Sequence, residues 1–280
     1  MTLKKTKDLH TITHHTLSIQ ISLSGLSFCV LNTKTKRISS FEQIEFDKRL
    51  NPLETLGQLM HYFDVRDYLQ AEFDDITVIH ENDISTLVPK ALFNADHLAD
   101  YLKFNSKILK SDYLSYDVLK HGDTVNVYVP YVNINNYIYE AFGAFTYKHF
   151  STILLDYVLE NKKQSSADTI YVHVSKDHFE IIIVENNGLK LYNTYEYINA
   201  EDFIYYILFT IEQLNYNPET IHIELFGKVS TDSPLYKITY KYIRNINLRK
   251  QETIYGYTPV QDLETSSYII LNSFNANNFR

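Results

Sequence analysis

The stretch "IYVHVSKDHFEIIIVENNGLKLYNTYEY", Ile170–Tyr197, predicts three consecutive β-strands. Apolar residues alternate at Val172 and Val174, and a polar turn then leads into a second apolar run. Asn187 and Gly188 tolerate the positive φ of a tight hairpin, and a third strand follows them. The stretch therefore predicts an antiparallel meander.

The same pattern occurs earlier in "LSIQISLSGLSFCVLNTKTKRISSFEQIEF", Leu17–Phe46. Each copy leads into a helix with an N-cap asparagine, Asn51 or Asn199, and then into a strand that is rich in β-branched residues. The order β-β-β-α-β occurs twice, about 150 residues apart, and indicates an internal duplication. We expect Ile19 and Val172 on equivalent central strands.

The polar stretch "ENKKQSSAD", Glu160–Asp168, has the composition of a linker between two units. The prediction is a first domain at residues 1–165 and a second at residues 166–280. Within the first, "TLVPKALFNADHLADYL" at Thr86–Leu102 is interpreted as a helix.

This doubled unit resembles the actin-like ATPase superfamily, in which two RNase-H-like domains hold a nucleotide between them. The pattern, including "LVPKALF" at Leu87–Phe93 and "IHIELFG" at Ile221–Gly227, is most similar to a Bacteroidetes family known as domain-of-unknown-function family 3822. It is more distantly similar to the type IV pilus assembly actin-like protein. The resemblance covers about Thr16 to Phe274 and implies an actin-like ATPase fold: two tandem RNase-H-like domains with mixed five-stranded sheets.

The resemblance also implies where nucleotide loops should lie, and the residues there have changed. Gln20 and Ser22 stand at the first loop's acid and glycine positions, and His173 and Ser175 stand at those of the second. An acid there holds Mg²⁺ or orients water, and a glycine lets backbone N–H groups approach the phosphates. Gly227 alone matches a glycine that contacts adenosine in the superfamily.

Two further residues lie in these turns at shifted positions. Gly25 and Asp177 could be reused by a rearranged loop, although a turn glycine and a solvated turn acid are the commoner explanation. We expect no metal site, because His14 and His15 have no further ligand at suitable spacing.

Composition limits the classes of function. Twenty-six Lys and Arg against 34 Asp and Glu give a net charge of −8, which repels nucleic acid and anionic membranes unless a local basic patch overrides it. The mixed basic and aromatic residues of Tyr236–Lys250 are interpreted as a solvated helix. The single cysteine and the absence of a signal-peptide pattern predict a cytoplasmic protein without a membrane span.

Two functions therefore remain. The first is a noncatalytic binding or scaffolding module, a pseudo-ATPase without cofactor that holds an unknown protein partner. The alternative is a divergent ATPase or phosphotransferase that binds ATP and Mg²⁺ in the interdomain cleft. The sequence does not predict the oligomeric state.

Overall fold

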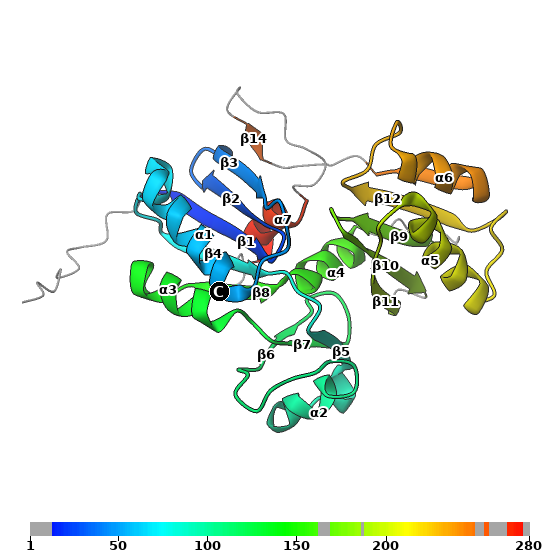
Figure 1. Ribbon diagram of the computed structural model, residues 1–280, viewed down its shortest axis with the longest axis horizontal. Coiled ribbons are helices and arrows are strands. Elements are labelled where there is room, and N and C mark those ends of the chain that lie inside the picture. Colours follow the sequence, from blue (N-terminus) through cyan, green and yellow to red (C-terminus); the bar gives the residue numbers. More distant parts are fainter. Residues whose placement is uncertain (1–12, 162–168, 186–187, 250–254, 258–267, 277–280) are drawn as a thin grey trace, which may run out of the picture.

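The computed structural model describes residues 13–161, 169–185, 188–249, 255–257 and 268–276. Within these ranges the chain forms two large mixed β-sheets, which lie side by side with helices on both faces, and a smaller third sheet (Figure 1). The predicted linker residues 162–168 and the turn residue Asn187 lie outside the described residues.

The first sheet has the order β14-β3-β2-β1-β4-β8. Its strands are β1 (His15–Ser22), β2 (Gly25–Asn32), β3 (Arg37–Glu45), β4 (Asp75–His80), β8 (Thr146–His149) and the two-residue β14 (Gly256–Tyr257). The central strand β1 runs antiparallel to β2 and parallel to β4.

The second sheet has the order β11-β10-β9-β12-β13. Its strands are β9 (Thr169–Val174), β10 (His178–Glu185), β11 (Gly188–Glu196), β12 (His222–Gly227) and β13 (Asn245–Leu248). The strand β9 is antiparallel to β10 and parallel to β12, as β1 is to β2 and β4. Ile19 and Val172 therefore lie on equivalent central strands, as the sequence predicts.

The helices form layers around the two sheets. They are α1 (Pro52–Val65), α3 (Val132–Phe142), α4 (Phe150–Glu160), α5 (Ala200–Gln213), α6 (Pro234–Tyr242) and α7 (Tyr268–Ala276). The predicted start of α1 is confirmed: the Asn51 side chain accepts the Glu54 N–H, and the Glu54 carboxylate accepts the Asn51 N–H. Residues of α1 and α3 cover one face of the first sheet, and those of α5 and α6 cover the outer face of the second.

Helix α4 lies between the two sheets and joins their cores. Ten of its eleven residues, Phe150 to Leu159, are buried. One apolar cluster contains residues of α4 and α7 together with Ile79 from the first sheet and Phe226 from the second. Because this core is continuous, the two sheets are packed together through α4 and not only connected by the chain.

The first half also contains an inserted subdomain, residues 84–128, which differs from the predicted helix at Thr86–Leu102. This segment forms β5 (Ser85–Pro89), short 3₁₀ turns (Lys90–Leu92 and Ala95–His97) and the five-residue α2 (Leu98–Leu102). With β6 (Ser115–Val118) and β7 (Thr124–Tyr128) it makes a three-stranded antiparallel sheet in the order β5-β7-β6. Pairing of β5 with a strand some forty residues later along the chain overrides the local helical pattern.

The C-terminal segment returns to the first sheet, whereas the sequence placed it in a second domain at residues 166–280. The strand β14 pairs with β3, and α7 packs on β1, β2 and β4. The Ser273 and Ser18 hydroxyl groups are 2.6 Å apart in this interface. Burial of the apolar side of α7, with Ile269 and Ile270 each 1% exposed, explains the return. Among the described helices, none combines the length and hydropathy needed to cross a bilayer.

Candidate functional site

A pocket lies between the two sheets, where the central strands β1 and β9 end. Its lining includes the β1–β2 turn at residues 22–25, the β9–β10 turn at residues 175–178, and Glu81 directly after β4. The carboxyl ends of adjacent parallel strands are the usual place for ligand sites in α/β proteins. The pocket volume is about 130 Å³, below the ~300–1,000 Å³ of typical ligand pockets.

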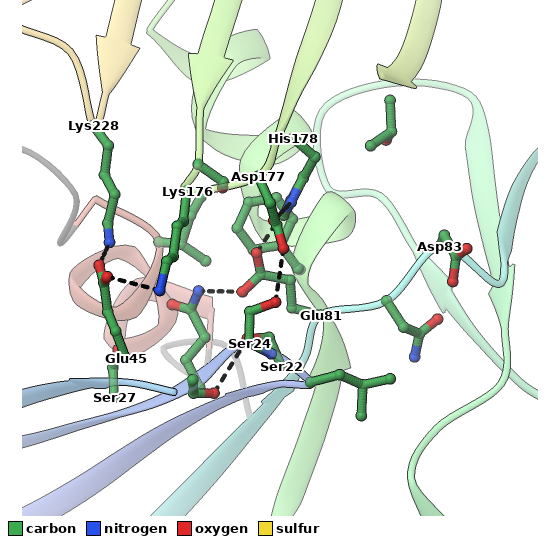
Figure 2. Close-up of a pocket in the computed structure, with 18 of the residues that line it drawn as sticks. Ser22, Ser24, Ser27, Glu45, Glu81, Asp83, Lys176, Asp177, His178 and Lys228 are labelled. Carbon is green, nitrogen blue, oxygen red and sulfur yellow. Dashed lines mark hydrogen bonds and ion pairs between the residues drawn. The ribbon is translucent and has the colours of Figure 1, made fainter. Parts of the chain in front are cut away.

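The two turns contact each other directly. The Ser24 hydroxyl, from the β1–β2 turn, donates a 2.8 Å hydrogen bond to Asp177 Oδ2 in the β9–β10 turn. Figure 2 shows this bond crossing from one sheet to the other. The β1–β2 and β9–β10 turns, between which the resemblance predicts a phosphate group, are therefore joined by a hydrogen bond.

Two lysines of the second sheet converge on one carboxylate of the first. Lys176 Nζ lies 3.2 Å from Glu45 Oε2, and Lys228 Nζ bonds Glu45 Oε1 (Figure 2). Lys176 also donates a 3.1 Å hydrogen bond to the backbone carbonyl of Phe46. Glu45 thus pairs with both of the positive charges on this side of the cleft.

A third cation, Arg49 of the first half, forms ion pairs at the rim of the cleft. Its guanidinium lies 3.1 Å from Glu196 of β11 and 3.9 Å from Asp83. These side chains are half-exposed or more, so water and salt screen the pairs and each is weak.

His178 lies at the centre of the cleft among three carboxylates. Its Nδ1 is 2.7 Å from Asp177, and its Nε2 is 3.3 Å from both Glu81 and Glu180. Burial opposes protonation, but the carboxylates of Glu180, Asp177 and Glu81 outweigh it and raise the pKa of His178 well above its ordinary value. The imidazolium is thus a positive charge that links β10 to Glu81 of the first half.

Two of these carboxylates, Glu180 and Asp177, are held in their ionised form. Glu180 is buried, which favours its neutral form, but His178 and a 2.8 Å hydrogen bond with His173 lower the pKa of Glu180 to about 2. The hydrogen bond with His178 also lowers the pKa of Asp177. Among the described residues, no group of three or more His, Cys, Asp and Glu has the geometry of a metal site.

The comparisons with known proteins agree with this architecture. The family model described as "Protein of unknown function (DUF3822)" matches residues 4–246. The chain belongs to this family. No curated protein matches it.

Two solved structures show the fold. A protein from Bacteroides thetaiotaomicron VPI-5482, with an actin-like ATPase fold and unknown function, has a TM-score of 0.76 at 24% identity and covers 84% of this chain and 91% of that one. The PilM–PilN type IV pilus biogenesis complex has a TM-score of 0.51 at 9% identity, with coverage of 92% and 96%. The predicted family and the actin-like ATPase fold are therefore confirmed.

Four of the predicted site residues, Gln20, Ser22, His173 and Ser175, line the pocket. Each of them makes a hydrogen bond to another group of the protein. Gln20 Nε2 donates a 2.8 Å hydrogen bond to Glu81. The Ser22 hydroxyl donates to the Gly25 carbonyl across its own turn. The imidazole of His173 binds Glu180, and the Ser175 carbonyl accepts the Tyr197 hydroxyl.

Gly227 has a backbone reason to be glycine. Its φ is +91°, and a Cβ there would lie 2.4 Å from the Val174 carbonyl oxygen. At Gly25, the first residue of β2, the backbone φ is not positive, but a Cβ would lie 2.4 Å from the Ile44 carbonyl oxygen, so close approach of the two strands favours glycine there too. Asp177 differs from the expected solvated turn acid, since it bonds Ser24 across the cleft.

Sequence reasoning missed the residues that join the halves, chiefly Glu45, Glu81, Lys176, His178 and Lys228. Glu81 could have been suspected, because it directly follows a buried parallel strand next to β1. The others depend on how the two halves pack, which no local pattern specifies.

Proposed function

We propose that this protein is a noncatalytic member of the actin-like fold, a pseudo-ATPase that binds a protein partner and has no nucleotide cofactor. The observation that carries the proposal is the direct hydrogen bond from Ser24 to Asp177, which joins the two turns next to the expected nucleotide-loop positions. A nucleotide phosphate between the loops would have to break this bond and the convergence of Lys176 and Lys228 on Glu45.

Charge in the cleft supports the same conclusion. Six carboxylates line the pocket: Glu45, Glu81, Asp83, Asp177, Glu180 and Glu196. The cations that line it are Arg49, Lys176, Lys228 and the protonated His178, and each is paired with one of these acids. Phosphoryl transfer needs cations and backbone N–H groups aimed at phosphate oxygens. The cations present are instead paired with acids, and the six carboxylates outnumber the four cations.

The shared core suggests a platform whose two halves stay together. Helix α4 is buried along almost its whole length between the sheets, and ion pairs close the cleft above it. Clamps that cycle on nucleotide need hinges that open, whereas this packing opposes opening. Apart from the additional strand β14, the two sheets have the same strand order, which supports an origin by internal duplication.

Likeness in fold supports the binding of a protein partner. PilM, which shares the fold, is found in a complex with PilN, so this fold can hold another protein. We place the contact at the cleft rim, where Arg49 and Glu196 are exposed. A cytoplasmic location without nucleic-acid binding completes the proposal, in accord with the charge of −8.

Affinity purification with a charge-swapped rim tests the partner. The double variant Arg49→Glu/Glu196→Arg keeps an ion pair across the cleft but reverses the pattern that a partner meets. We expect the native protein to recover a specific partner from its own cells, and the swapped variant to lose it while keeping its thermal stability. Recovery of no specific partner, together with a thermal shift from a metabolite library, would overturn the proposal in favour of a small ligand.

A further inference from the structure

Large apolar side chains are exposed on the inserted subdomain, residues 84–128. Leu92 is 71% exposed, Phe104 82%, Leu109 62% and Tyr113 56%. The subdomain has its own small core, in which Val88, Leu102, Val125 and Val127 are buried. The exposed residues are therefore additional to the core, and three of them fall within residues 104–113. Large exposed apolar patches mark sites of contact with proteins or membranes.

Within this subdomain, residues 103–113 are basic in an otherwise acidic chain. Residues 103–113 contain Lys103, Lys107 and Lys110 against one acid, Asp112, while the whole chain carries −8. Lys103 Nζ lies 2.7 Å from Asp100 and 5.8 Å from the centroid of the Phe104 ring. Among the described residues, Lys107 and Lys110 make no ion pair.

We propose that this segment, Lys103–Tyr113, docks on the surface of an anionic lipid bilayer. Phe104 and Leu109 would enter the interfacial region, and Lys107 and Lys110 would bind the phosphates of the headgroups. Aromatic and aliphatic side chains alternating with lysines suit this interface, because long lysine stems let the charge stay at headgroup level. Lys107 and Lys110 supply a local attraction that the acidic chain as a whole lacks.

The position of the subdomain favours a lipid surface over a protein groove. It projects from the two large sheets, at the lower edge of Figure 1. The apolar residues lie on its outside, whereas the pocket described above lies in the cleft and includes none of them. Projection also separates the segment from the acidic cleft, and charges more than about 8 Å apart are largely screened at physiological salt.

The chain contains no tryptophan, so a single introduced tryptophan reports its own surroundings. We expect the fluorescence of Phe104→Trp to shift to shorter wavelength with vesicles of phosphatidylglycerol and phosphatidylcholine, and to be quenched by brominated lipid. Vesicles of phosphatidylcholine alone should have little effect. Phe209→Trp on α5, which replaces another exposed aromatic residue, is the matched control and should not respond.

Charge reversal tests the lysines separately. Lys107→Glu/Lys110→Glu should weaken binding to the anionic vesicles by at least about tenfold, whereas Lys237→Glu/Lys241→Glu on α6 should leave it unchanged. No response of Phe104→Trp to anionic vesicles would overturn the proposal. An equal fall in the α6 variant, or equal binding to neutral vesicles, would also overturn it. A blue shift of Phe104→Trp with a purified acidic protein, without any vesicle response, would assign the surface to a protein partner instead.

Discussion

Ser24 of the β1–β2 turn donates its hydroxyl hydrogen to Asp177 of the β9–β10 turn, with the two oxygens 2.8 Å apart. These residues are 153 positions apart in the chain, and the bond joins the two halves at the place where the sequence resemblance predicts a nucleotide. The cleft is therefore closed by the protein's own side chains.

Removing the Ser24 hydroxyl should loosen this closure. We expect Ser24→Ala to lower the free energy of unfolding by about 1 kcal/mol, because a partly exposed bond to a charged acceptor is lost. Urea unfolding measures the change. Ser111→Ala, at an exposed loop position, is the control and should change stability by less than about 0.5 kcal/mol. Equal effects of the two substitutions would show that the bond does not contribute.

The stabilisation by His178 should depend on pH in a defined direction. The folded-state pKa of His178 is raised above 6.5, so its contribution is complete below pH 6.5 and is lost as pH rises through the higher folded value. The pKa of Glu180 is lowered from 4.5 to about 2, so its contribution is complete above pH 4.5 and is lost as pH falls toward 2. The stability difference between the native protein and His178→Gln should therefore be largest between pH 4.5 and 6.5 and shrink in strongly alkaline solution. A difference that grows with alkaline pH would contradict the ion-pair account.

Two glycine substitutions should act in opposite directions. Gly227→Ala should lower the free energy of unfolding by about 1–3 kcal/mol, because the new Cβ meets the Val174 carbonyl and the backbone φ is positive.

Gly57→Ala should raise the free energy of unfolding by about 0.5–1 kcal/mol, since residue 57 lies in α1 and no atom lies within 4 Å of the new methyl group. Thermal unfolding of both variants checks the signs, and a stabilised Gly227→Ala would disprove the tight approach of β12 to β9.

The C-terminal helix should be essential for the first half. Ile270→Ala should cost about 2–5 kcal/mol, because Ile270 on α7 is 1% exposed in the core shared with α4. Ile198→Ala, at a site that is 93% exposed, should change stability by less than about 0.5 kcal/mol. Similar, small losses of unfolding free energy in both variants would show that the packing of α7 on the first sheet does not stabilise the protein.

The repeated strand order could be predicted from the sequence, whereas the contacts between the two halves could not. Alternation at Val172 and Val174 and the cap at Asn51 are local signals, and both elements form where they predict. Local patterns failed at Thr86–Leu102, where the pairing of β5 with β7 decides the structure. They also gave no sign that α7 returns to the first sheet, because its partners lie about 190 to 260 residues away along the chain.

The candidate site likewise combines residues that the sequence predicts with ion pairs that it does not. The resemblance predicts, residue by residue, that Gln20, Ser22, His173 and Ser175 stand at the positions of loop acids and glycines. The ion pairs that fill the cleft could not, because a lysine or histidine in a turn gives no indication of which carboxylate it will meet after the domains pack. Their geometry comes from the packing around α4.

Calorimetric titration of the purified protein with Mg-ATP, together with a phosphate-release assay, tests the central claim most directly. The account predicts no saturable heat of binding in the micromolar range and no hydrolysis above the uncatalysed rate. Micromolar binding of Mg-ATP that is lost in Ser175→Trp would contradict it, because a nucleotide would then occupy the cleft that Ser24 and Asp177 close.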